Sequence, residues 1–392
     1  MTRISLHRNY FLILIYLLQT IIVSVFSLVT AEPKDSLIGL TILAVLSYSL
    51  FCKKRIQWDC VFVCLFVWLS FYLSLQYHPE YAKLYSDQLY VRIISISGGP
   101  IGYLIIRQYS NVKDIRNIIK ICTVVLFCYY TLKTIGFNAA SEEDGGMRLA
   151  YGMIVASVGS LAFALTEKKT IWIVLSVLTF LETVYIGQRG PLLCIISFLV
   201  FYYLFLRESN VSGVKKILYL LAIFIIIGLI SLYIEEIMQA FYNVFSGIMG
   251  KTRILGKIAS GEMTDSSGRD GIYLLAIEKI SEGNWVAYGP LSDQYSMDMF
   301  CHNIALELMM TYGFIPGLTI CILILAEFFV IMLSKLPFEK RLFYLVFFSC
   351  SIPRLCVSNS FWYDSFFWIT LGYGTMLIRE IIINKKKQVV IV

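Results

Sequence analysis

Residues 301–334 read CHNIALELMMTYGFIPGLTICILILAEFFVIMLS, and this stretch decides the class of fold. Its second half is an apolar run long enough to cross a bilayer, which takes about 20 residues in a helix. A single helix over 302–334 would be about 50 Å long, against a hydrocarbon core of about 30 Å. Gly313, Pro316 and Gly317 interrupt it, because glycine and proline break helices. The stretch therefore predicts a short surface helix over 302–312, followed by a transmembrane helix.

The rest of the chain is also apolar. Of its 392 residues, 58% are hydrophobic and 15% are charged, whereas a soluble domain carries about 25% charged residues. The apolar runs predict an all-α polytopic membrane protein with about 12 transmembrane helices, since lipid requires every backbone polar group to be paired within its segment. The expected spans are 10–30, 37–52, 60–77, 89–106, 119–137, 149–165, 170–187, 191–206, 217–234, 313–334, 342–358 and 361–383.

Lysine and arginine predict the orientation. With both termini in the cytoplasm, the clusters Lys53–Arg55, Lys113–Lys120 and Lys385–Lys387 all face the cytoplasm, as such residues do in membrane proteins. The net charge of +7 follows this rule and does not indicate nucleic acid. Outside the membrane, residues 235–301 form the one long connection, and Ile272, Leu275, Ala276 and Ile280 lie on one stripe of an amphipathic helix within it.

The domain organisation follows from these spans. Residues 1–234 are expected to hold transmembrane helices one to nine. Residues 235–312 are expected to form a large outer loop with amphipathic helices. The last three transmembrane helices and a cytoplasmic tail are expected over 313–392.

The cysteines and acidic residues predict no disulfide framework, no metal site and no cofactor. Apart from Cys301, the ten cysteines lie in or at the ends of apolar runs, where they act as small hydrophobic residues. Cys301 falls in a polar outer segment, so we expect it to react most readily with a reagent added from outside. Asp293 and Asp298 have no flanking ligands that would complete a metal site.

His302 is the candidate catalytic residue. Asn303 is suited to cap the short helix, so His302 lies beside the free N–H groups of a helix N-terminus, which favour an anion such as phosphate. The chain has three histidines. His7 is expected in the cytoplasm, and His78 lies in a short loop without other features. A contact with lipid headgroups or simple packing remains the alternative for His302.

Arginines form the second candidate group. Six of them are expected on the outer side, where positive charge should be scarce. They are Arg92, Arg148, Arg189, Arg253, Arg269 and Arg354. Arginine binds phosphate oxygens through paired N–H groups. Any one of them could instead contact headgroups, but the whole set indicates an anionic, phosphate-bearing ligand.

Three sequence blocks surround the outer loop in a recognisable order. The first is Ile186–Gly190 (IGQRG). The second is Ser267–Asp270 (SGRD), followed by a helix and Tyr288–Pro290 (YGP). The third is His302–Asn303, followed by Gly313 after nine further residues. In this order the blocks, which cover residues 186–318, resemble the O-antigen polymerase and O-antigen ligase superfamily of bacterial cell envelopes.

The resemblance implies a GT-C-like glycosyltransferase in the bacterial inner (plasma) membrane, with its active site on the periplasmic face. Its donor would be an undecaprenyl-pyrophosphate-linked oligosaccharide, and no metal or other cofactor would be needed. His302 would be the general base that deprotonates the acceptor hydroxyl, while Arg189 and Arg269 would neutralise the leaving pyrophosphate. Further contacts with the substrate are expected from Arg354, Arg92, Arg148, Asn303 and Glu307. Membrane lipids and a chain-length regulator protein are the other expected partners.

Three functions remain open at this stage. The favoured one is a polymerase that joins lipid-linked repeat units of O-antigen or capsule-type polysaccharide with inversion at the anomeric carbon. A ligase of the same superfamily shares the blocks and differs in its acceptor. A flippase or transporter for lipid-linked oligosaccharide would also need many spans, although transporters usually contain repeated halves and a site near the midplane.

Overall fold

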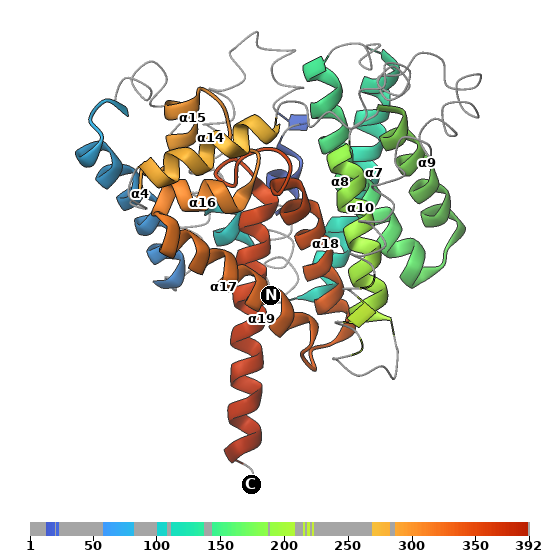
Figure 1. Ribbon diagram of the computed structural model, residues 1–392. Coiled ribbons are helices and arrows are strands. Elements are labelled where there is room, and N and C mark those ends of the chain that lie inside the picture. Colours follow the sequence, from blue (N-terminus) through green and yellow to red (C-terminus); the bar gives the residue numbers. More distant parts are fainter. Residues whose placement is uncertain are drawn as a thin grey trace. The chain divides into compact units, whose positions relative to one another are not determined.

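A computed structural model describes residues 13–19, 21–22, 58–81, 100–107, 111–136, 143–186, 189–207, 215, 218–219, 222, 269–282 and 287–390. Within these ranges every regular element is a helix and there is no strand (Figure 1). The all-α prediction is therefore confirmed for this part of the chain. The chain divides into two compact units, Met1–Ile118 with Gly271–Val392, and Ile119–Asp270. We describe each unit by itself.

The described helices lie close to the apolar runs of the sequence. The first unit contains α4 (Trp58–Tyr77), α15 (Ser292–Met297), α16 (Ile304–Tyr312), α17 (Phe314–Met332), α18 (Phe338–Leu355) and α19 (Ser365–Val390), together with most of α14 (Arg269–Glu282). The second unit contains α8 (Glu143–Glu167), α9 (Thr170–Ile186), α10 (Arg189–Phe201) and the π-helical turn η1 (Tyr202–Leu206), together with most of α7 (Val112–Gly136).

Four described segments are long and apolar enough to cross a membrane: Val112–Thr134, Leu149–Glu167, Phe314–Met332 and Ser365–Lys386. Shorter apolar helices occur at Val61–Tyr77, Thr170–Thr183 and Gly190–Leu206. All seven overlap predicted spans. The expected span 37–52, and most of 10–30, 89–106 and 217–234, lie outside the described residues. On α17, Ile315, Ile322 and Leu323 are exposed, and lipid is the solvent that such an apolar surface requires.

The break between α16 and α17 lies where the sequence predicts it. Gly313 separates the two helices with a φ of 89°, a left-handed value that favours glycine. A Cβ atom on Gly317 would lie 2.6 Å from the carbonyl oxygen of Leu308, so only glycine allows α17 to fold back so closely on α16. At the other end of α16, Oδ1 of Asn303 accepts hydrogen bonds from the N–H groups of Ala305 (3.0 Å) and Leu306 (3.3 Å). The predicted cap is confirmed.

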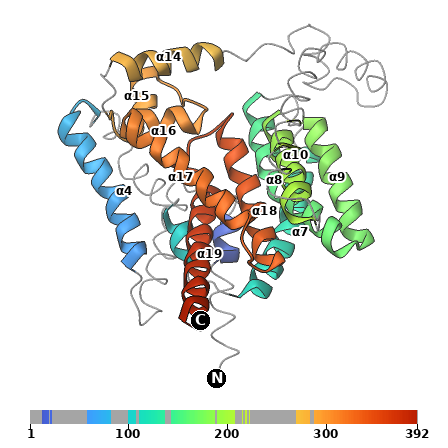
Figure 2. The same ribbon diagram turned by 60° about the horizontal axis from the view of Figure 1, so that its bottom comes forward.

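A small core joins α14, α15 and α16 at one end of the first unit. The predicted stripe of α14 is confirmed, since Ala276 and Ile280 are buried against Met297, Cys301 and Met310. Figure 2 shows α14 and α15 beside α16, next to the start of α17. The expectation that Cys301 is accessible is wrong. Its side chain is fully buried beneath α14, and its Sγ lies 3.4 Å from Sδ of Met310.

The opposite end of the first unit carries ion pairs. Arg116 bonds Glu339 at 2.9 Å and Lys340 bonds Glu380 at 2.6 Å. The C-terminal end of α19, with its lysines, projects at this end, away from α14, α15 and α16 (Figure 1). Within the first unit, the lysines near the end of α19 and the helices α14, α15 and α16 therefore lie at opposite ends.

In the second unit, α8 and α9 pack through hydroxyl side chains. The hydroxyl oxygens of Ser157 and Thr183 lie 3.4 Å apart, and so do those of Ser160 and Thr179. Small and hydroxyl-bearing residues allow membrane helices to approach closely and to hydrogen-bond across the interface.

Candidate functional site

His302 stands at the N-terminal end of α16, as the sequence predicts. Its φ of 52° is left-handed, a conformation that few residues other than glycine adopt. The hydroxyl of Tyr273 on α14 lies 3.5 Å from the carbonyl oxygen of His302 and donates to it. The ring of Phe300 lies 6.2 Å from the imidazole, between centroids. The contact with Tyr273 holds the backbone of His302 against α14. The residue is half-buried, so part of it stays open to solvent.

Two buried carboxylates support the segment that carries His302. Asp293, 1% exposed, accepts hydrogen bonds from the N–H groups of Gln294 and Cys301, both at 2.9 Å. Burial raises the pKa of Asp293 above its ordinary value, and the two N–H groups oppose the rise. Asp293 therefore anchors the residue before His302. Among the residues that the structure describes, no group of three His, Cys, Asp or Glu side chains is placed to hold a metal ion.

Glu307 is the second buried carboxylate, one turn into α16 and only 3% exposed. Its Oε1 accepts a hydrogen bond from the Ser360 hydroxyl, and its Oε2 accepts one from the N–H of Phe361 at 3.2 Å. Burial, and after it the nearby carboxylate of Asp293, raises the pKa of Glu307 well above its ordinary value. The sequence predicts that Glu307 contacts the substrate. In the structure both of its carboxylate oxygens accept hydrogen bonds from the protein itself, from Ser360 and Phe361.

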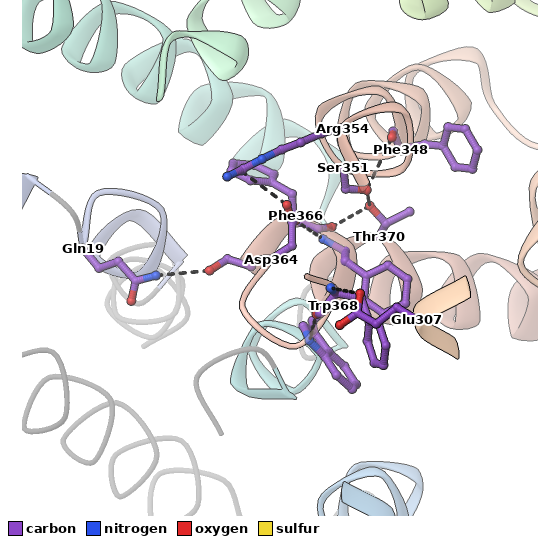
Figure 3. A network of polar contacts seen from close by, with 12 residues as sticks. Gln19, Glu307, Phe348, Ser351, Arg354, Asp364, Phe366, Trp368 and Thr370 are labelled. Carbon is purple, nitrogen blue, oxygen red and sulfur yellow. Dashed lines mark hydrogen bonds and ion pairs between the residues drawn. The ribbon is translucent and has the colours of Figure 1, made fainter. Parts of the chain in front are cut away.

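Arg354, near the end of α18, faces a third buried carboxylate. Its Nη1 lies 3.4 Å from Oδ2 of Asp364, which is 1% exposed (Figure 3). Burial raises the pKa of Asp364, and the positive charge of Arg354 opposes this rise. The side chain of Arg354 is 24% exposed. One side of Arg354 is therefore held by Asp364, while part of the group remains accessible to an anionic ligand.

A segment that the sequence analysis did not single out connects these residues. We call residues 356–364, between α18 and α19, the 356–364 loop. Ser360 and Phe361 bind Glu307, and Asp364 pairs with Arg354. The ring of Tyr363 lies 6.0 Å from that of Phe300, which precedes His302 by two residues. The loop therefore contacts α16, α18 and the segment next to His302.

The 356–364 loop could not be recognised in the sequence because part of it is apolar. Phe361, Trp362 and Tyr363 read as the start of the last apolar run, and so the expected span began at residue 361. Asp364 was the available signal, because aspartate before an apolar run commonly caps a helix. In the structure Oδ1 of Asp364 accepts from the N–H of Phe367 at 2.8 Å, and α19 begins at Ser365.

The Tyr288–Pro290 block packs against the far end of α16. The N–H of Tyr288 donates to the carbonyl of Met310 at 2.9 Å, and that of Gly289 donates to Thr311 at 3.0 Å. Gly289 has a φ of 89°, and a Cβ there would collide with Ser74 of α4. The block therefore joins α4 and α16, and the positive φ and the close approach of Ser74 explain why residue 289 is a glycine.

His78, the other histidine considered for the outer face, has a different environment. Its Nδ1 lies 3.1 Å from Oε1 of Glu80. Its ring stacks on Tyr81, with centroids 5.0 Å apart, and on Tyr288 at 6.0 Å. His78 is thus part of an aromatic cluster that also includes Tyr295, whose ring lies 4.3 Å from that of Tyr81.

Four of the expected site residues lie in the first unit. His302, Asn303 and Glu307 lie at the start of α16, and Arg354 is linked to α16 through the 356–364 loop. Arg269 is the first residue of α14 and is half-buried. Arg189 begins α10 in the second unit. Its side chain and that of Arg148 lie outside the described residues, as do Arg92 and Arg253 entirely.

Comparison with protein-family models, with curated proteins and with solved structures finds no match to this chain.

Proposed function

We propose that this chain is a GT-C-like glycosyltransferase with about 12 spans in a bacterial inner membrane, and that it polymerises lipid-linked repeat units of O-antigen or capsule-type polysaccharide. The observation that carries the proposal is the position of His302 at the capped N-terminus of α16, directly ahead of the membrane-spanning α17. A base at this place can reach a sugar hydroxyl in water while the donor's lipid remains in the bilayer.

In the proposed reaction, an acceptor sugar hydroxyl attacks the anomeric carbon of an undecaprenyl-pyrophosphate-linked glycan. The new glycosidic C–O bond forms as the C–O bond to pyrophosphate breaks, with inversion at that carbon. The imidazole of His302 takes the hydroxyl proton, a contribution of about 10²- to 10⁴-fold in rate. The pyrophosphate leaves with the bonding electron pair, and arginines stabilise its charge.

Arg354 supports this proposal through its partial exposure and its link to the loop that contacts Phe300, two residues before His302. Arg189 and Arg269 are proposed for the leaving pyrophosphate from their sequence blocks. A polymerase binds two lipid-linked glycans at once, and the set of six outer arginines suits two pyrophosphate groups.

Two other functions are outcomes of the test. A ligase would transfer the finished polymer to lipid A–core, and a flippase would move lipid-linked oligosaccharide across the membrane without forming a bond. Deletion of the gene separates the three, with surface glycan and the lipid-linked pool analysed by gel. Loss of a polymerase leaves single repeat units on the final acceptor and removes long chains.

The other outcomes contradict the proposal in different ways. Full-length polymer stranded on undecaprenyl pyrophosphate would identify a ligase. Lipid-linked single units that accumulate on the cytoplasmic face would identify a flippase. Complementation with the intact gene controls for effects on neighbouring genes.

A further inference from the structure

Glu307 contacts the loop that pairs with Arg354 and packs against Phe300, two residues before His302. We propose that Glu307 is a positioning residue whose carboxyl group ties the 356–364 loop to α16 and thereby holds His302 and Arg354 at one site. The effect expected on kcat rests on the proposed function. The effect expected on the accessibility of the loop rests on the geometry alone.

The contact is built from both sides. Ser360 donates through its hydroxyl to Oε1, and Phe361 donates through its N–H to Oε2 at 3.2 Å. Oγ of Ser360 in turn accepts from the N–H of Trp362 at 3.2 Å. Three consecutive loop residues are therefore ordered around one carboxyl group. Glu307 lies on a helix whose start is fixed by the Asn303 cap.

The rest of the loop is packed tightly enough to transmit this restraint. Phe361 and Trp362 are 2% and 0% exposed and pack in a core with Leu308 of α16. The carbonyl of Phe361 accepts from Nε1 of Trp368 at 3.0 Å, which joins the loop to α19 (Figure 3). A loop with one face buried and both ends bonded moves as a unit. Releasing its centre from α16 would therefore shift Tyr363 and Asp364, and with them the surroundings of His302 and Arg354.

The protonation state of Glu307 separates this role from direct action on a substrate. A buried carboxylate without a paired cation is costly and becomes neutral instead. Burial raises the pKa of Glu307, and the carboxylate of Asp293, a charge of the same sign, raises it further. A neutral acid in this place needs only its shape and hydrogen bonds. Glutamine provides both. Its carbonyl oxygen accepts from the N–H of Phe361, and its amide N–H donates to the hydroxyl oxygen of Ser360, as the O–H of a neutral acid would.

The experiment compares four variants of the full-length protein in membranes. They are Glu307→Gln, Glu307→Ala, Ser360→Ala and the double variant Glu307→Ala/Ser360→Ala. Glu278→Ala, at an exposed position of α14, is the matched control. We expect Glu307→Gln to keep kcat within about threefold of the wild-type value, because its shape and hydrogen bonds are retained. We expect Glu307→Ala to lower kcat about 10- to 100-fold through misplacement of the reacting groups. The double variant should be no worse than Glu307→Ala alone, because both changes remove one contact.

A second measurement follows the loop without reference to catalysis. Ser358 is 5% exposed, so a Ser358→Cys probe, placed in a Cys356→Ser background, should resist a membrane-impermeant maleimide. Peptide mass spectrometry identifies the labelled site. With Glu307→Ala or Ser360→Ala added, the probe should label readily, whereas with Glu307→Gln it should stay protected. Labelling at position 358 tests the contact even in a protein that shows no glycosyl transfer, and so its failure is distinct from failure of the proposed function.

Two results would overturn the inference. One is a Glu307→Gln variant as inactive as Glu307→Ala with position 358 still protected, which would assign the carboxylate to the substrate. The other is a position 358 that stays protected in both Glu307→Ala and Ser360→Ala, which would show that the loop is held by other contacts.

Discussion

The guanidinium of Arg354 and the carboxylate of Asp364 form an unequal pair, with Nη1 and Oδ2 3.4 Å apart. The side chain of Asp364 is buried, whereas that of Arg354 is 24% exposed. Removing Arg354 leaves a buried negative charge without its cation, whereas removing Asp364 leaves a cation that can still reach solvent. Loss of Arg354 and loss of Asp364 should therefore lower the free energy of unfolding by different amounts.

We predict that Arg354→Ala lowers the free energy of unfolding by about 3 kcal/mol, as for a buried pair that loses one partner. Asp364→Asn should cost less, about 1 kcal/mol, because the amide keeps the shape of the side chain and can still accept from the N–H of Phe367. Thermal unfolding of the purified protein in detergent measures both. Equal losses for the two variants would contradict the unequal burial of the pair.

The buried Glu307 predicts a pH dependence of stability. Its pKa in the folded protein is raised well above the ordinary value of 4.5, so folding favours the protonated form. The stabilisation is fully present below about pH 4.5 and is lost as the pH rises through the raised pKa. Glu307→Gln removes this titration. The melting temperature of Glu307→Gln relative to wild type should therefore increase steadily from pH 4.5 upward, while Asp293, whose pKa is also raised, affects both proteins alike. A difference that does not change with pH would mean that Glu307 is ionised in the folded state.

The burial of Cys301 replaces the accessibility expected from the sequence with a new prediction. A membrane-impermeant maleimide applied to intact spheroplasts should label Cys356, which is exposed in the 356–364 loop, and should leave Cys301 unmodified. Burial also raises the pKa of the Cys301 thiol, which keeps the reactive thiolate scarce. Site-resolved mass spectrometry gives the answer, with Cys356→Ser as the control. Rapid labelling of Cys301 would show that α14 does not cover it.

Elements whose signals are local could be predicted from the sequence. The cap at Asn303, the break at Gly313 and the buried stripe of α14 each depend on residues within a few positions of one another, and all three are confirmed. The apolar runs likewise predict helices near their observed bounds, because lipid permits little else.

Contacts between distant segments could not be predicted in this way. Glu307 and Ser360 are 53 residues apart, and their hydrogen bond depends on how α16 packs on the 356–364 loop. The same holds for Cys301, which was expected to be exposed because it falls in a polar outer segment, yet it is covered by α14. Hydropathy predicts whether a segment lies in lipid or in water, but it does not predict which side chains contact each other.

The central claim is that His302 is the base of a glycosyl transfer, and purified protein tests it most directly. The assay supplies undecaprenyl-pyrophosphate-linked oligosaccharide in detergent and measures chain growth together with the undecaprenyl pyrophosphate released. We predict that wild-type protein and a His78→Gln control form polymer, and that His302→Ala loses about 10²- to 10⁴-fold in rate while retaining its melting temperature. Polymer formation by folded His302→Ala at the wild-type rate would contradict the account.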